Sequence, residues 1–367
     1  MGLIQQASVL RAKPELTGLP FFFCPINDNG GLKMKRMYTL IAALAVFLIF
    51  AFFTTNKNEQ ARSAKAKIPT VGILQLITHP ALDQIHQGFI AGLKEYGYTP
   101  GKNIKIDFQN AQGDQSNLKT MSTKFANENV DLMAGIATPA AQALANAANK
   151  KTPVILAGIT DPVGGGLVDS DKHPGGNITG TSGESPLKEQ LDLLKQILPN
   201  AKTVGIIYTS SDHGGQYNAK KFAKICKQQG INYKLYTISS TNDMQQVAEE
   251  ATSQVDAIYA PQDNGIASAM KTLVNVANKA KIPVIPSADT MVKDGGLASY
   301  AISQYDLGKV AGEMAAQVLR GRNTANFPVA YITKGKYIIN QKEAQLLGIK
   351  LPQNIVEQAE KEGEVFK

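Results

Sequence analysis

The stretches TVGILQ at residues 70–75 and TVGIIY at residues 203–208 are nearly identical, and they decide the fold. Each leads into a polar loop and an amphipathic segment, and a glycine follows 27 residues after each threonine, at Gly97 and Gly230. The 133 positions between the copies are too many for a solenoid unit but suit a small domain. The sequence therefore predicts one architectural unit used twice.

Around these two stretches, short runs rich in Val and Ile alternate with segments of helical pattern. Strands are expected at residues 70–75, 104–109, 131–137, 153–159 and 177–182, and again at 203–208, 233–238, 257–261, 283–288 and 297–302. Helices are expected at residues 81–97, 117–129, 139–151, 215–230, 243–254 and 266–280. Apolar strands that alternate with helices indicate parallel sheets covered on both faces. The predicted fold class is α/β, with two doubly wound parallel-sheet lobes.

The chain is expected to cross between the lobes more than once. The first crossing lies near residues 183–190, where Pro186 opens a helix. The segment 303–321 is one helix more than the second lobe needs, so we expect it to return and cover the first. The predicted boundaries are residues 68–184 plus about 303–325 for lobe 1, and 185–302 plus about 326–367 for lobe 2. A multi-crossing hinge between two sheets creates a ligand cleft.

The net charge of +8 is concentrated at the front of the chain. Residues 1–67 contain nine Lys and Arg against three Asp and Glu, whereas residues 68–367 contain 29 against 27. A body with such balanced charge has no basic stripe of the kind that binds a polyanion. Nucleic acid is therefore not expected as a partner.

The front segment contains 20 consecutive uncharged residues, 37–56, preceded by Lys33, Lys35 and Arg36. About 20 apolar residues cross a bilayer as a helix, and flanking cations favour a cytoplasmic amino terminus. We expect residues 34–67 to form a membrane anchor and linker; a cleaved signal peptide is the alternative. Either way, the body is expected outside the cytoplasm.

Residues 1–33 resemble neither targeting nor domain sequence, and a translation start at Met34 or Met37 would account for them. The chain has two cysteines, Cys24 and Cys226, so the body has no internal disulfide. A body of this length buries enough apolar surface to be stable without one.

Several segments of the body together resemble one known family. They are HPALD, ITDPV, GGNITGTS, PQDNGIASAM and SYAISQYDLGKVAGEMAAQVLRG, in this order within about residues 68–360. This body is similar to the TrpX-type substrate-binding proteins of ABC transporters. The resemblance implies the type I periplasmic-binding fold, an amino-acid ligand such as tryptophan, tyrosine or phenylalanine, and permease and ATPase subunits as partners. The lipobox usual in the family is missing, so the apolar helix would replace the lipid anchor.

Ligands of open α/β sheets bind at the carboxyl ends of the strands, where six loops of this chain qualify. The candidate ligand-binding residues in these loops are Gln75, Leu76, Thr78, Thr138, Thr160, Asp161, Thr209, Ser210, Ser211, Asp263, Asn264, Ser287 and Asp289.

Four of these loops suggest how an amino acid would be held. Leu76 would form part of a wall against an aromatic ring, or would pack only against the next helix. Thr138 is expected at an N-cap, where free N–H groups suit a carboxylate. Asp263 or Asp289 would hold the ammonium group, because a buried ammonium needs a carboxylate partner. Each aspartate could instead be an N-cap or turn residue.

Enzyme signatures are missing from the sequence. The four histidines have no metal-ligand spacing, and neither G-x-S-x-G nor a Cys/His signature occurs. The glycines at 164–166 lack the lysine and the order of a phosphate loop. No cofactor, metal or catalytic residue is therefore expected. A sugar or purine nucleoside is the alternative ligand, and a flavodoxin-like enzyme is the less favoured alternative function.

Overall fold

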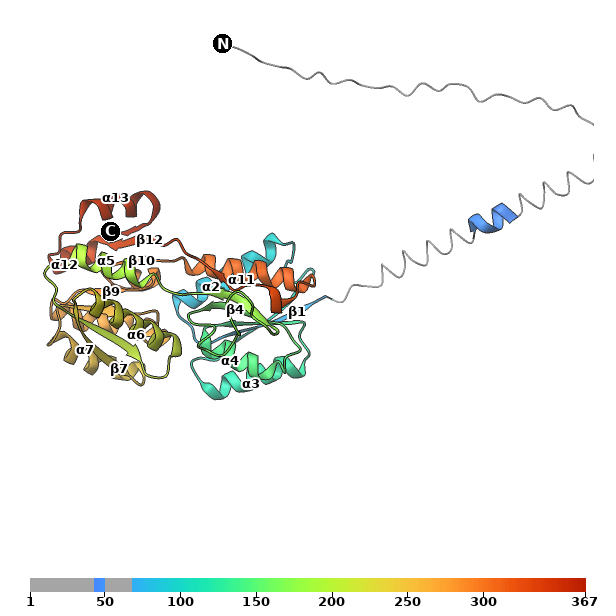
Figure 1. Cartoon of the computed structure of the whole chain (residues 1–367), viewed down its shortest axis with the longest axis horizontal. Coiled ribbons are helices and arrows are strands. Elements are labelled where there is room, and N and C mark those ends of the chain that lie inside the picture. The colour runs from blue at the N-terminus through green and yellow to red at the C-terminus, as the bar shows by residue number, and fades with distance from the viewer. Residues whose placement is uncertain (1–42, 50–67) are drawn as a thin grey trace, which may run out of the picture. The chain divides into compact units, whose positions relative to one another are not determined.

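A computed structural model describes residues 43–49 and 68–367 of the chain (Figure 1). Residues 43–49 are helical, and residues 68–367 belong to one compact unit. Within the described residues, none of the helices has the length and hydropathy of a transmembrane span. Most of the predicted membrane run 37–56, and all of the predicted extension 1–33, lie outside the described residues.

The first lobe is built on a six-stranded parallel sheet in the order β11-β5-β4-β3-β1-β2. Its strands are β1 (Thr70–Gln75), β2 (Lys105–Asn110), β3 (Leu132–Ile136), β4 (Val154–Ile159), β5 (Ile178–Ser182) and β11 (Ala330–Tyr331). Four helices cover it: α2 (Pro80–Glu95), α3 (Gln115–Asn127), α4 (Thr138–Ala147) and α11 (Gln304–Leu319). Figure 1 shows α2 and α11 on one side of the strands and α3 and α4 on the other.

The second lobe contains a four-stranded parallel sheet in the order β7-β6-β8-β9. Its strands are β6 (Thr203–Thr209), β7 (Asn232–Ile238), β8 (Ala257–Ala260) and β9 (Val284–Pro286). The accompanying helices are α5 (Leu187–Ile197), α6 (His213–Gln228), α7 (Met244–Thr252), α8 (Asn264–Ser268), α9 (Met270–Lys279) and α10 (Asp289–Lys293).

Alternate residues of the central strand β6 belong to two different hydrophobic cores. Val204 and Ile206 are buried with Phe222 of α6, whereas Ile207 is buried with Met244 of α7. Successive side chains of a strand point to opposite faces, so helices cover this sheet on both sides. The prediction of a doubly wound lobe is confirmed.

The repeated stretches are equivalent strands of different sheets, as predicted. β1 lies between β2 and β3, and β6 lies between β7 and β8. In each lobe the chain passes from this strand to the edge strand on one side of it, and then to the strand on its other side. The duplication in sequence is a duplication of topology.

The second lobe is not parallel throughout, and the prediction was wrong on this point. β10 (Ala298–Ala301) belongs to a separate three-stranded sheet with β12 (Lys336–Asn340) and β13 (Glu364–Phe366), and it runs antiparallel to β12. The parallel ladder stops at β9, which ends at Pro286, a residue without a backbone N–H to donate. Two helices follow in the tail, α12 (Gln341–Leu347) and α13 (Gln353–Glu362).

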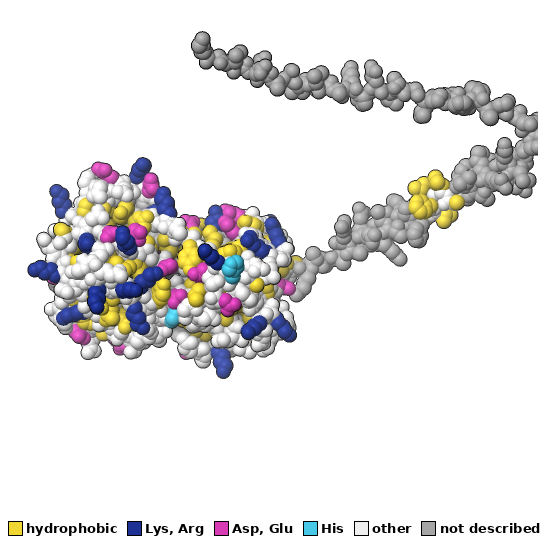
Figure 2. All heavy atoms as spheres, viewed as in Figure 1, with side chains coloured by type: hydrophobic (Ala, Val, Ile, Leu, Met, Phe, Trp, Pro, Cys, Tyr) yellow, Lys and Arg dark blue, Asp and Glu magenta, His cyan; other side chains and the backbone are white. Residues whose placement is uncertain are grey.

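Three segments connect the lobes. They are residues 183–186 between β5 and α5, 302–303 between β10 and α11, and 332–335 between β11 and β12. Since β11 pairs with β5, the last crossing lies later than the boundary near residue 326 that the sequence suggested. In Figure 2, basic and acidic side chains are both present on the visible face of each lobe.

The helix that returns from the second lobe packs on α2 through glycines. Gly88 and Gly92 of α2 lie against the backbone of Tyr305 and Lys309, and Gly308 of α11 lies against the backbone of Ile85. A Cβ at any of these glycines would overlap a backbone oxygen. The two helices therefore touch backbone to backbone, which explains why α11 covers the first lobe, as predicted.

Replacing Gly308 by Ala is expected to destabilise the fold. The added methyl group forces the helices apart, which costs about 1–3 kcal/mol and outweighs the gain of about 1 kcal/mol in helix propensity. Thermal unfolding should show a midpoint lowered by several degrees. Gly176→Ala is the matched control, because nothing lies within 4 Å of its added Cβ. Equal midpoints for the two variants would contradict a close helix contact.

Candidate functional site

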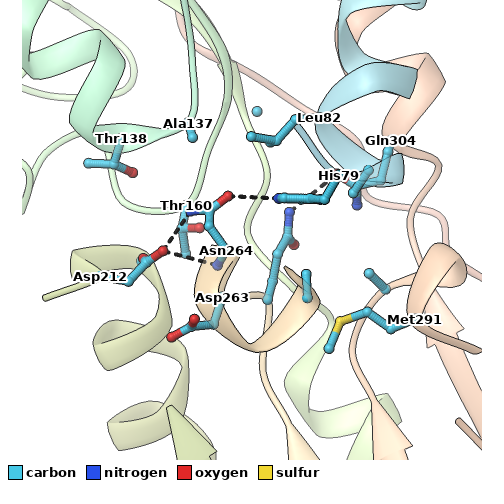
Figure 3. Close-up of a pocket in the computed structure, with 16 residues that line it drawn as sticks. His79, Leu82, Ala137, Thr138, Thr160, Asp212, Asp263, Asn264, Met291 and Gln304 are labelled. Carbon is cyan, nitrogen blue, oxygen red and sulfur yellow. Dashed lines mark hydrogen bonds between the residues drawn. The ribbon is translucent and has the colours of Figure 1, made fainter. Parts of the chain in front are cut away.

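A small cavity of about 30 Å³ lies between the two lobes (Figure 3). Both lobes line it, at the carboxyl ends of β3, β4, β6 and β8. The labelled lining residues in Figure 3 are His79, Leu82, Ala137, Thr138, Thr160, Asp212, Asp263, Asn264, Met291 and Gln304. Its free volume is about that of one water molecule, so the lobes are nearly closed on each other.

The first lobe contributes the amino terminus of α4. Thr138 is the first helical residue and not the N-cap that the sequence suggested, because Ala137 takes the cap position. Ala137 has φ 76°, a left-handed value that is unfavourable for a residue with a side chain. No side chain caps this helix, so its first N–H groups and the Thr138 hydroxyl remain available at the cavity.

The second lobe contributes two buried aspartates, each of which caps a helix. Asp212 begins α6, where its carboxylate accepts hydrogen bonds from Gly215 N at 2.9 Å and from both nitrogens of Asn264. Asp263 begins α8, where its carboxylate accepts from Ile266 N and from the backbone and hydroxyl of Thr209. These bonds fix both carboxylates at the floor of the cavity.

The two carboxylates lack a cationic partner, because no Lys or Arg occurs among the described residues that line the cavity. Burial, together with the charge of Asp212, raises the pKa of Asp263 to about 7. The site therefore has two buried acids and, among its described lining residues, no Lys or Arg, so its potential is negative, most strongly above pH 7 where Asp263 is ionised. It therefore favours a ligand that carries a positive charge.

A hydrogen-bond chain crosses the cavity from one lobe to the other. His79, the N-cap residue of α2, lies with its Nε2 3.2 Å from Asn264 Oδ1, and Asn264 Nδ2 donates to Asp212. Because the Asn264 amide donates to the carboxylate, its oxygen faces His79, which therefore donates from Nε2–H. Burial lowers the pKa of His79 below its usual 6.5, so the ring is neutral at pH 7.

The structure brings part of the predicted site together. Thr138, Thr160, Asp263 and Asn264 line the cavity. Leu76, Thr209 and Ser211 line an adjoining hollow of about 260 Å³, which shares Asp212 and Asn264 with the cavity.

The other predicted residues line neither space. Gln75 is buried and donates to Asp83, and Thr78 accepts a bond from Asn110. Three more predicted residues lie outside both spaces. The Asp161 carboxylate accepts from Gly164 N, the Ser210 carbonyl accepts from Gln216, and the Ser287 carbonyl accepts from Gln190.

Asp289 was a wrong choice for a carboxylate of the cleft. It lies in a different hollow, with Ile338 and Glu364 of the three-stranded sheet. The start of α10 lies between the cavity and the strands β10 and β12: Ala288 and Met291 line the cavity, whereas Asp289 faces the three-stranded sheet. Its carboxylate accepts a bond from Thr290 N instead.

Three residues of the cavity were not chosen from the sequence as binding residues. Asp212 was recognised as part of the polar loop after β6, and the duplication could have singled it out, because it stands after β6 just as Asp263 stands after β8. His79 and Gln304 lie at the starts of α2 and α11, but their sequence neighbours give no sign that the second lobe buries them. Among the described residues, no group of three or more His, Cys, Asp or Glu is arranged for a metal ion.

Two α/β lobes with three crossings and a polar interlobe cavity define a two-lobed ligand-binding protein. The comparison with known families agrees. The chain belongs to the family of ABC transporter substrate-binding proteins, whose model matches residues 70–362.

Three similar proteins share most of the chain. A tyrosine-binding protein of Clostridioides difficile is 38% identical over 86% of this chain and 93% of its own. A crystal structure of an ABC domain with L-Trp from Streptococcus pneumoniae is 44% identical, with a TM-score of 0.78 over 81% and 99% of the chains. A ligand-free, open substrate-binding protein from Clostridium difficile is 34% identical, with a TM-score of 0.64 over 82% and 99%.

Asp289→Asn is expected to change how stability depends on pH. Burial raises the pKa of Asp289 from 3.8 to about 6, so between these values the folded chain holds a proton that the unfolded chain has lost. This group therefore makes the parent less stable as pH rises through that window. At pH 7.5 the variant should be more stable by about 2 kcal/mol, and at pH 4 nearly equal to the parent. Urea unfolding at both pH values measures the free energy of unfolding of the variant and the parent. The same difference between them at both pH values would contradict a raised pKa of Asp289.

Proposed function

We propose that this chain captures a free aromatic L-amino acid between its lobes and delivers it to an ABC importer. The family supports the role in transport. The ligands named for two similar proteins, tyrosine and L-Trp, support an aromatic amino acid. The permease and ATPase subunits of the importer would be the protein partners.

The observation that carries this proposal is the pair of buried carboxylates without a cation. An ammonium group would neutralise them, and Asp212 is the better partner. In Figure 3 its carboxylate points toward Thr160 and Asn264, whereas that of Asp263 points away from them. Asp263 would contribute through its charge and by holding Thr209.

The opposite side of the cavity suits the carboxylate of the same ligand. The uncapped start of α4 offers N–H groups and the positive end of the helix dipole. Thr138 lines the cavity at this terminus, and Thr160 lines it closer to Asp212 (Figure 3). An α-amino acid has its two charged groups one carbon apart, so one ligand would reach both lobes.

The remaining lining supplies apolar surface for the ligand side chain. Leu82 of α2, Met291 of α10 and Ala288, the N-cap residue of α10, line the cavity. In Figure 3, Leu82 and Met291 lie away from Asp212. A cavity of 30 Å³ is too small for an amino acid, so the ligand would enter when the lobes separate and would hold them slightly further apart than here.

Variants of Asp212 and Thr138, at the two polar ends of the cavity, test how the ligand is proposed to be bound. Asp212→Asn should weaken binding of L-tyrosine or L-tryptophan at least a hundredfold, because a buried charge without its partner costs about 3–5 kcal/mol. Thr138→Val should weaken it ten- to a hundredfold, since a hydrogen bond to a charged group contributes about 1.5–3 kcal/mol. Isothermal titration calorimetry measures both values.

Asp289→Asn is the matched control, because Asp289 lies outside the cavity. Its affinity should equal that of the parent. Thermal midpoints of each variant without ligand identify any loss of folding. If Asp212→Asn binds as tightly as the parent, the ammonium is not held there, and a neutral ligand such as a sugar or nucleoside becomes the better proposal.

We further propose that residues 37–56 hold the body on the outer face of the membrane. The 20 uncharged residues and the preceding cations support an anchor. In cells that express the full chain, the body should sediment with membranes and be digested by protease added outside. Release of a shortened body into the medium would favour the cleaved signal peptide instead.

A further inference from the structure

His79 is the point at which the first lobe touches the buried acid pair of the second. The residue is 6% exposed, and Nε2 reaches Asn264, 185 positions further along the chain. Asn264 is held in turn by two bonds to Asp212. The contact therefore joins the start of α2 to the starts of α6 and α8, and separation of the lobes would break it.

The other ring nitrogen of His79 is also informative. Nδ1 is buried and has no hydrogen-bond partner within residues 68–367. A proton on Nδ1 would make it a buried donor that belongs to a charged ring and has no acceptor, which costs more than a neutral acceptor without a donor. The closed arrangement thus accommodates the neutral ring and penalises the charged one.

We propose that His79 is a positioning residue that holds the lobes closed through Asn264, and that it does so only when its ring is neutral. The proposal concerns closure before any ligand is bound. When the lobes open, the ring meets water and can be protonated near its ordinary value of 6.5. Acidification below that value then shifts the chain toward the open form.

The charged groups around His79 oppose this effect but do not cancel it. Asp83 of α2, Asp212 at the start of α6 and Asp294 at the end of α10 all favour the protonated ring. Burial outweighs them, so the pKa of His79 in the closed form is lowered. Closure therefore releases a proton. The closed-to-open ratio decreases as pH falls through about 6.5, by at most tenfold per pH unit.

Two further groups at the contact between the lobes bear on the measurement. His213 of α6 lies with Nε2 3.6 Å from a carboxylate oxygen of Asp161, which follows β4 in the first lobe. Asp263, whose pKa burial raises to about 7, lines the same cavity as His79. The variants must therefore separate the effect of His79 from these two groups.

The comparison with related structures agrees with a closed arrangement. The TM-score is 0.78 to the structure that contains L-Trp and 0.64 to the ligand-free, open one, over nearly equal shares of this chain. The contact of His79 with Asn264 belongs to this closed geometry.

Closure can be measured without ligand by energy transfer between dyes on the two lobes of the full chain. Lys119 of α3 and Gln245 of α7 are exposed and can be replaced by Cys. Cys24 is replaced by Ser, and Cys226 is buried and stays unlabelled. The ratio of closed to open molecules is then followed from pH 8 to pH 5.

His79→Ala should lower the closed-to-open ratio at pH 8 about fivefold, the effect of one hydrogen bond, and Asn264→Ala should do the same from the other lobe. His79→Gln keeps an N–H donor but cannot titrate, so its ratio should not fall on acidification. The fall should persist in His213→Gln, which removes a second histidine that lies between the lobes. His86→Gln is the control on the same helix, because His86 stacks on Phe108 away from the cavity.

The proposal is wrong if His79→Ala keeps the closed-to-open ratio and pH profile of the parent. It is also wrong if the effects of His79→Ala and Asn264→Ala simply add in the double variant, since partners in one contact are coupled. Circular dichroism at pH 8 verifies that each variant is folded. No amino acid is present in these measurements, so their outcome does not depend on the proposed ligand.

Discussion

The contact between α2 and α11 determines where the first lobe places its part of the cavity. Glycines in the second half of α2 and in the first half of α11 let the two helices meet backbone to backbone, and this contact sets the position of both amino termini. Those termini carry His79, Leu82 and Gln304 to the cavity. Because α11 enters directly from the second lobe, the same contact fixes one of the crossings around which the lobes can move.

The second lobe uses its acids both for structure and for recognition. Asp212 and Asp263 cap α6 and α8, so they satisfy backbone groups that would otherwise be buried without partners. Their charge is not compensated within the cavity, which raises the free energy of the empty closed state. A cationic ligand group removes that cost, so ligand binding and closure favour each other.

A histidine buried between the lobes gives closure a dependence on proton concentration. Burial lowers the pKa of His79, so its ring is neutral in the closed arrangement. For a chain proposed to work outside the cytoplasm, the surrounding pH would then adjust how readily the empty lobes close. The physical cause is the desolvation of the ring, which disfavours its charged form.

The sequence by itself determined the two α/β lobes, the equivalence of β1 and β6 and the loops that carry the site, because strand and helix patterns are local. It could not determine which loop residues face the cavity. Asp212, Asp263 and Asp289 all follow a strand and begin a helix. Only the tertiary structure turned Asp289 toward the three-stranded sheet and buried His79 under Asn264. The physical reason is that a side chain's burial and charge depend on residues from the other lobe, far along the chain, which no local pattern specifies.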